Sequence, residues 1–241
     1  MKIAVVGGTG TLGSAVVAAL TGRDVVALGR STSPSIDLRD GTGFDEALQG
    51  VDVVIDASNA PAGAKAAAVF VAGTRRLLDA EARAGVSHHV GVSIVGCEHI
   101  DAAYYRAKRE QERIVETGPV PWSIVRATQF HDFLAALFTA SARYGAVPAP
   151  RGVLQPVDVE VVARLIADVA LGPPRHDRAE ITGPRVEPIP TLAQAWKTAR
   201  RSRAVVVPVP LPRAIGHRIR AGALTNPGAP HRGQVTFEAW L

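Results

Sequence analysis

The chain has 241 residues, of which 47% are hydrophobic, 20% charged and only 5% aromatic. A chain of this length buries roughly 70% of its unfolded surface, and its aliphatic content excludes intrinsic disorder. A single cysteine, Cys97, excludes a disulfide framework and an all-cysteine metal site. The net charge of +5 is uneven, because residues 1–170 carry 16 basic and 18 acidic side chains whereas residues 171–241 carry 11 and 4.

Residues 3–22 carry no charge and follow Lys2, a pattern shared by signal peptides and membrane anchors. Five glycines and four hydroxyl side chains interrupt this stretch, so that two short apolar runs replace one long one. A strand, a glycine turn and a helix account for the composition better. We therefore expect a cytoplasmic protein that is not bound to a membrane.

Strand-like and helix-like segments alternate along the first 171 residues. Predicted strands cover residues 3–6, 25–28, 35–38, 51–56, 88–93 and 122–125. Predicted helices cover residues 12–20, 62–84, 102–117, 130–144 and 157–171. Because the strands are apolar on both faces and separated by helices, they predict an α/β fold, a doubly wound parallel sheet of the Rossmann type.

The pattern changes after Gly145, where prolines and arginines become frequent. Residues 204–212 contain three prolines, which excludes them from a central strand because proline lacks a ladder donor. We expect a Rossmann domain over residues 1–145. A small lobe over residues 146–241 is expected to cover the substrate and to complete the same globular unit.

A glycine-rich loop, GGTGTLG at residues 7–13, follows the first predicted strand and opens the first predicted helix. Glycine permits the tight turn and the close approach of a pyrophosphate, and the helix N-terminus offers free amides to the anion. This context favours a dinucleotide site over an ordinary glycine turn. The predicted cofactor contacts in the loop are Gly7, Thr9, Gly10, Thr11, Leu12 and Gly13.

The second strand bears on the choice of cofactor. Sites for NAD usually end this strand with Asp or Glu, which accepts from the ribose 2′-hydroxyl, but here Arg30 and Ser31 follow it. An arginine can pair with a 2′-phosphate and stack on adenine, and Ser31 and Thr32 can donate to the same phosphate. These residues predict NADP(H) rather than NAD(H), although Arg30 could also be a solvated loop side chain.

The chain resembles the atypical short-chain dehydrogenase/reductases, in particular the NmrA-like NAD(P)H-binding branch. The resemblance spans nearly the whole chain and rests on the glycine loop, Asp37-Leu38, VIDASN at 54–59, SIVG at 93–96, YYRAKREQE, VRATQFHDF at 125–133, PVDVEVVA, ITGP and TFEAWL. It implies that Asp37 and Leu38 line the adenine. It also implies that Ala57, Ser58 and Asn59 run along the ribose and pyrophosphate, and that Gln129, Phe130 and His131 lie near the nicotinamide.

Three residues have the spacing of a reductase site. Ser93 ends the fifth predicted strand, and Tyr104 and Lys108 share one face of a helix at i, i+4 spacing. A nearby ammonium lowers the pKa of a tyrosine and can hold the nicotinamide ribose, while a serine hydroxyl can polarise a substrate carbonyl. The resemblance implies these roles for Ser93, Tyr104 and Lys108. The rarity of lysine, 4 residues beside 23 arginines, favours a specific role for Lys108 over a chance match.

Other candidate residues have simpler interpretations. We expect His88 and His89 at the surface, Cys97 as a small apolar filler and Asp158 as a helix cap. No His, Cys or carboxylate cluster has metal-ligand spacing, so we expect no metal. The arginines of residues 200–220 lack interleaved aromatic residues, so we expect a solvated surface rather than nucleic-acid binding.

These observations predict an NADP(H)-dependent oxidoreductase that acts on a small carbonyl, quinone or enone-type molecule. A non-catalytic NADP(H)-binding sensor is the main alternative, because many proteins of the resembled branch bind the cofactor without evident catalysis. A nucleotide-sugar epimerase or dehydratase is the third, disfavoured by the short segment after the sheet. The substrate, the direction of reaction and the oligomeric state do not follow from the sequence.

Overall fold

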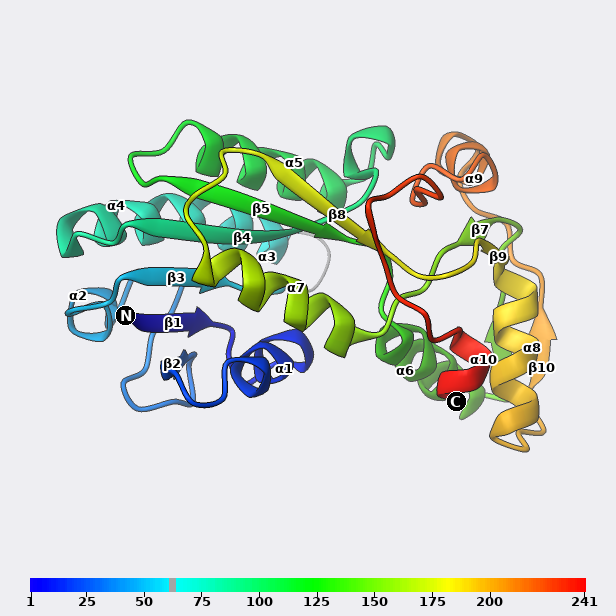
Figure 1. Cartoon of the computed structure of the whole chain (residues 1–241). Helices are drawn as coiled ribbons and strands as arrows, with labels where there is room; N and C mark the ends of the chain where they lie inside the picture. Colours follow the sequence, from blue (N-terminus) through cyan, green and yellow to red (C-terminus); the bar gives the residue numbers. More distant parts are fainter. Residues whose placement is uncertain (61–63) are drawn as a thin grey trace. The chain divides into compact units, whose positions relative to one another are not determined.

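The computed structural model describes residues 1–60 and 64–241 (Figure 1). These residues form two compact units, each assembled from three stretches of chain. Unit 1 comprises Met1–Ser93, Ala103–Arg126 and Glu160–Ala179, and unit 2 comprises Ile94–Ala102, Ala127–Val159 and Glu180–Leu241. The predicted division into a Rossmann domain over residues 1–145 and a small lobe over residues 146–241 stays a prediction.

A seven-stranded sheet runs in the order β11-β8-β5-β4-β3-β1-β2. Its strands are β1 (Lys2–Val6), β2 (Asp24–Leu28), β3 (Val53–Asp56), β4 (His88–Ile94), β5 (Trp122–Ala127), β8 (Arg178–Thr182) and β11 (His231–Arg232). Strand β1 pairs in parallel with both β2 and β3, and β3 pairs in parallel with β4. The predicted doubly wound α/β fold is therefore confirmed, and the strand order reverses direction between β1 and β3.

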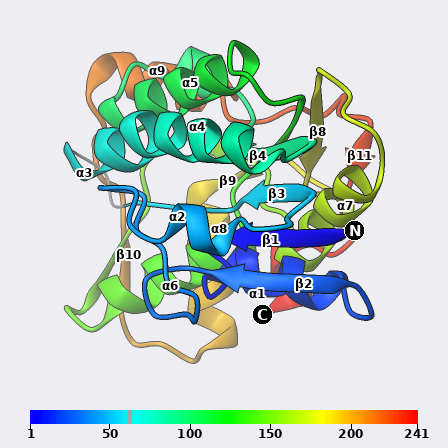
Figure 2. The same cartoon turned by 90° about the vertical axis from the view of Figure 1, so that its left-hand side faces the viewer.

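Helices cover both faces of the sheet in unit 1 (Figure 2). The helices of this unit are α1 (Thr11–Ala19), α2 (Phe44–Ala47), α3 (Ala64–Ala67), α4 (Thr74–Ala84), α5 (Ala103–Glu116) and α7 (Val159–Leu171). One core cluster joins apolar side chains of α2, α4 and α5 to those of β1 and β3. Figure 2 shows α1 and α7 on the opposite face, and the central strands β1 and β3 are almost wholly buried.

The strand predicted over residues 35–38 is wrong. A single parallel bridge joins Gly29 to Ser35, and the Ile36 amide donates to the Gly29 carbonyl at 3.0 Å. The chain then turns, because the Asp37 side chain accepts from the Arg39 amide at 2.9 Å. An acidic side chain that bonds to the backbone two residues on competes with a sheet ladder.

The long helix predicted over residues 62–84 is interrupted. Residues 62 and 63 lie outside the described residues, and from Ala64 onward α3 passes into the π-helical segment Ala68–Gly73 before α4 begins. A Cβ on Gly73 would lie 2.8 Å from the Leu38 carbonyl oxygen, so glycine permits the close approach at this point. The predicted stop is confirmed, since α4 ends at Ala84 and its C-cap, Gly85, has a φ of 77°.

Unit 2 contains α6 (His131–Ala142), α8 (Ile189–Ala199), α9 (Arg213–Arg220) and α10 (Phe237–Trp240), and η2 (Cys97–His99). Two small sheets pair β10 (Val205–Val207) with β6 (Ala146–Pro148), and β7 (Val153–Leu154) with β9 (Glu187–Pro188). Strand β10 lies outside the seven-stranded sheet, as the prolines predict. In contrast, β8 and β11 belong to that sheet, which the sequence did not indicate. Among the described residues, no helix combines the length and apolarity needed to cross a membrane.

Candidate active site

The glycine loop of residues 7–13 connects β1 to α1 at the point where the strand order reverses. The backbone of Gly7 has a φ of 76°, and its amide donates to the Leu28 carbonyl at 2.8 Å. A Cβ on Gly7 would lie 2.9 Å from the Ala57 carbonyl oxygen, and one on Gly13 would collide with the Gly7 carbonyl. Ligands of open α/β sheets bind at such a switch point.

Helix α1 begins beside this loop without a capping side chain. Its N-cap is Gly10, which accepts from the Ser14 amide at 2.8 Å, and its first turn contains no acidic residue. The side chains of Thr9 and Thr11 are exposed, whereas Leu12 is buried in the core. The backbone amides and the positive end of the helix dipole therefore make the loop suited to an anion such as a pyrophosphate.

The segment after β2 carries the residues predicted to select the cofactor. Arg30 and Ser31 are exposed. The Thr32 hydroxyl accepts from the Gly29 amide at 2.9 Å and donates to the Pro34 carbonyl at 2.6 Å. The hydroxyl thus closes the turn, and its donation to a 2′-phosphate stays a prediction.

Asp37 forms an ion pair with Arg39, a residue that no sequence motif indicates. The Arg39 Nη2 atom lies 2.5 Å from the carboxylate, and this bond lowers the pKa of Asp37 to about 2, with a smaller contribution from the charge of Arg30. Leu38 is half-buried against the core cluster below α4. Arg30 and Arg39 thus share the neighbourhood of one ionised carboxylate, and the predicted adenine contacts of Asp37 and Leu38 stay predictions.

The loop after β3 joins the glycine loop to a tyrosine. The Ala57 amide donates to the Val6 carbonyl at 3.0 Å, and the Ser58 amide donates to the Asp56 carboxylate at 3.0 Å. The next side chain, Asn59, accepts from the Tyr104 hydroxyl at 2.9 Å. The structure therefore brings Tyr104 and the predicted cofactor residues 57–59 to the same end of the sheet.

Tyr104 and Lys108 lie on one face of α5, as the spacing predicts, and both contact Phe70. The Tyr104 and Phe70 rings meet edge to face at 5.5 Å, and the Lys108 ammonium lies 4.6 Å from the Phe70 ring centroid. Burial raises the pKa of Tyr104, which is opposite to the predicted lowering by the lysine. The Lys108 Nζ atom donates to the Val92 carbonyl at 2.6 Å and to the Gln111 amide oxygen at 2.5 Å, and these bonds fix its place on α5.

Ser93 is buried at the end of β4, close to an ion pair. Two hydrogen bonds of 2.9 and 2.6 Å join Arg126 to the Glu112 carboxylate. Burial raises the pKa of Glu112, but the hydrogen bonds from Arg126 and the charges of Arg126 and Arg178 outweigh it, so the pKa is lowered overall. The Ser93 hydroxyl is buried without a hydrogen-bond partner among the described residues, and its role toward a substrate oxygen stays a prediction.

Gln129, Phe130 and His131 belong to unit 2. Phe130 is the N-cap of α6 and bridges to Val157, and the Gln129 carbonyl accepts from the Val157 amide at 2.8 Å. His131 is fully buried beside Phe237, and burial lowers its pKa. Its Nε2 atom lies 3.1 Å from the Val235 carbonyl oxygen, so His131 supports the core of unit 2.

The two histidines expected at the surface are buried, which corrects the prediction. His89 pairs with Glu81 at 2.9 Å, and both side chains are fully buried. His88 lies 2.9 Å from the Ser123 hydroxyl. Both faces of a central strand are covered in this fold, so a polar residue there must find a partner.

Cys97 is fully buried, in agreement with a filler role. No group of three or more potential metal ligands occurs in the described part of the chain.

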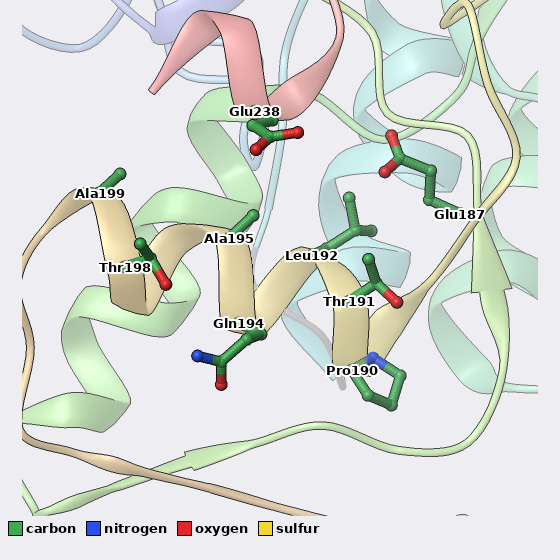
Figure 3. Close-up of a pocket in the computed structure, with 9 residues that line it drawn as sticks. All are labelled: Glu187, Pro190, Thr191, Leu192, Gln194, Ala195, Thr198, Ala199 and Glu238. Atoms are coloured by element: carbon green, nitrogen blue, oxygen red, sulfur yellow. The ribbon is translucent and has the colours of Figure 1, made fainter.

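A cavity of about 600 Å³ lies along α8 within unit 2 (Figure 3). Leu192 and Ala195 point from the helix toward Glu238 of α10, and Glu187 borders the same space. Burial raises the pKa of Glu187, and the neighbouring Glu238 adds to this effect. None of the predicted cofactor or catalytic residues lines this cavity.

Comparisons with known proteins agree with this architecture. The family model described as NAD(P)H-binding matches residues 7–173. A relative from Streptomyces griseus subsp. griseus, (4-alkanoyl-5-oxo-2,5-dihydrofuran-3-yl)methyl phosphate reductase, is 32% identical over 133 residues. That match covers 52% of this chain and 44% of the relative, so it spans less than half of the relative's length.

Similar solved structures include a nucleoside-diphosphate-sugar epimerase from Staphylococcus aureus, at 17% identity and a TM-score of 0.80, covering 100% of this chain and 99% of that one. An NADPH-dependent quinone oxidoreductase from Escherichia coli has 17% identity and a TM-score of 0.77, covering 99% and 98%. A Citrobacter sp. triphenylmethane reductase complexed with NADP(H) has 18% identity and a TM-score of 0.72, covering 93% and 90%. At these identities the likeness shows the fold alone.

Proposed function

We infer that this chain, which belongs to the NAD(P)H-binding family, is an NADP(H)-dependent reductase of a small carbonyl, quinone or enone-type molecule. The observation that carries this proposal is the hydrogen bond of 2.9 Å from the Tyr104 hydroxyl to the Asn59 side chain. Asn59 lies two residues after Ala57, whose carbonyl packs against Gly7 of the glycine loop. A proton donor and a glycine cradle for a pyrophosphate thus share one end of unit 1. A reductase of this class requires both.

Each group has a defined task in this proposal. The cradle of residues 7–13 holds the pyrophosphate, and Arg30 pairs with the 2′-phosphate that distinguishes NADP(H). When bound, the cofactor supplies the hydride. Lys108 holds the nicotinamide ribose, and Ser93 orients the substrate oxygen. The partner we propose is a small molecule rather than a nucleic acid.

The phenol of Tyr104 can supply the proton of a reduction. Burial raises its pKa, so the phenol stays protonated at neutral pH and can donate to the oxygen that gains charge during hydride transfer. The Streptomyces griseus relative, 32% identical over 133 residues, is likewise named as a reductase.

The variant Tyr104→Phe tests the proposal. We expect turnover of quinones and carbonyls, followed by loss of NADPH absorbance, to fall about 100-fold because the general acid is removed. Affinity for NADPH should stay within about twofold, since the hydroxyl bonds to Asn59 and not to the glycine loop.

Tyr105→Phe is the matched control, because Tyr105 stacks edge to face on Tyr104 at 5.7 Å and offers the same loss of a hydroxyl one residue away. Equal turnover in Tyr104→Phe and the wild type would refute the catalytic assignment. Tight NADPH binding without turnover on a panel of carbonyls and quinones would favour the non-catalytic sensor.

A further inference from the structure

A buried polar network lies beneath the bond between Tyr104 and Asn59. It consists of Asp56, Thr74, Lys108 and Gln111, whose exposed fractions are 1%, 0%, 4% and 4%. These side chains come from β3, α4 and α5. An ammonium and a carboxylate are thus enclosed together, which is costly unless hydrogen bonds satisfy both.

Gln111 is the member that connects the two charges. Its amide oxygen accepts from the Lys108 ammonium at 2.5 Å, and its amide nitrogen donates to the Asp56 carboxylate at 3.0 Å and to the Thr74 hydroxyl at 3.1 Å. If the Gln111 amide were flipped, its nitrogen would face the Lys108 ammonium, donor against donor. Its oxygen would then face the Asp56 carboxylate, acceptor against acceptor. The hydrogen-bonding character of Lys108 and Asp56 therefore fixes the orientation of the Gln111 amide.

The bridge separates the opposite charges by one amide group. Without Gln111, attraction to Asp56 would favour a direct contact and draw the ammonium away from the Val92 carbonyl and from the Phe70 ring. With Gln111 present, Lys108 retains a fixed position one turn from Tyr104. The other oxygen of Asp56 accepts from the Ser58 amide, so the same network reaches the loop of residues 57–59.

We propose that Gln111 is the positioning residue for Lys108, and that it sets the nicotinamide-ribose end of the cofactor site. This inference rests on the proposed function, in which Lys108 holds that ribose. It assigns a role to a residue that touches neither substrate nor cofactor and acts through a single charge-assisted hydrogen bond. The proposed contacts of the glycine loop with the pyrophosphate and of Arg30 with the 2′-phosphate do not depend on it.

The test compares two ligands on the full chain. NADPH carries the nicotinamide riboside, whereas adenosine 2′,5′-bisphosphate lacks it. In Gln111→Met the dissociation constant of NADPH should rise about tenfold, and that of the bisphosphate should change less than about twofold. Ser123→Ala is the control for general destabilisation, because it removes a buried hydroxyl that bonds to His88 and to the Arg175 amide.

A double-mutant cycle shows whether Gln111 acts through Lys108. If it does, Gln111→Met with Lys108→Met should bind NADPH within about twofold of Lys108→Met alone. Losses that multiply, or an equal loss for NADPH and the bisphosphate in Gln111→Met, would overturn the proposal. If the wild type binds neither NADPH nor NADH, the proposed function fails instead. The same double-mutant cycle, measured as free energies of unfolding, then tests whether Gln111 positions Lys108. If the losses of stability in the two single variants add up in the double variant, the positioning role is refuted.

Discussion

Two glycines of the loop allow cofactor binding to be separated from folding. A Cβ on Gly13 would collide with the Gly7 carbonyl oxygen and lie 2.8 Å from the Gly8 Cα atom, and both are backbone atoms that cannot move aside. A Cβ on Gly10 would meet only the Gly7 carbonyl oxygen, at 3.3 Å, in a backbone conformation that any residue adopts. The same added methyl group therefore has two different consequences.

We expect Gly13→Ala to destabilise the protein by about 3 kcal/mol, the upper range for overpacking, because α1 must shift as a body. For a chain of this size, that corresponds to a fall in Tm of about 6–12 °C. Gly10→Ala should leave the Tm within about 2 °C but weaken NADPH binding more than about tenfold, because its methyl group occupies the space that a pyrophosphate approaches.

Thermal unfolding and titration of NADPH fluorescence measure the two quantities on the same samples. Gly22→Ala is a control for backbone strain, since Gly22 has a φ of 84° with nothing within 4 Å of its Cβ position. Wild-type affinity for NADPH and NADH in Gly10→Ala would refute the assignment of the loop as the pyrophosphate site. An unchanged Tm in Gly13→Ala would refute the packing argument.

Two further predictions concern the cofactor and the pH dependence of stability. Arg30→Ala should raise the dissociation constant of NADPH about tenfold and leave that of NADH within about twofold, and parallel losses in the two titrations would contradict a 2′-phosphate contact. Burial lowers the pKa of His88 to about 4, so as the pH falls below 6.5 the unfolded chain takes up a proton that the folded chain does not. The free energy of unfolding should therefore fall by about 2 kcal/mol more between pH 7 and pH 4.5 in the wild type than in His88→Gln, as measured in urea, and identical falls would contradict it.

The features that the sequence predicts are local ones. The loop of residues 7–13, the alternation of strands and helices, and the i, i+4 pair of Tyr104 and Lys108 each lie within a short window, where periodicity and turn chemistry determine structure. The misplaced strand over residues 35–38 shows the limit of such windows. Its apolar residues fit a strand, but Asp37 bonds to the Arg39 amide and the chain turns.

Buried polar residues could not be predicted in the same way, because their partners are distant in the sequence. His89 pairs with Glu81 on α4, eight residues earlier, and His88 meets Ser123 on the neighbouring strand, 35 residues later. A histidine at the start of a strand gives no sign of which helices will cover it. Glu112 likewise pairs with Arg126 on β5, 14 residues later, and the sequence marks it only as one of several acidic residues on α5.

The role of Lys108 could be predicted only in part from the sequence, and its surroundings explain why the chain keeps a lysine there. Composition indicated a special role, since the chain has 4 lysines beside 23 arginines. The structure supplies the physical reason, because the ammonium occupies a space bounded by the Val92 carbonyl, the Gln111 amide oxygen and the Phe70 ring. A guanidinium is planar and carries five donors that would each need an acceptor in this enclosed space. A compact ammonium has only three donors and reaches the same acceptors. The surrounding network therefore selects lysine over the arginine that the chain otherwise prefers.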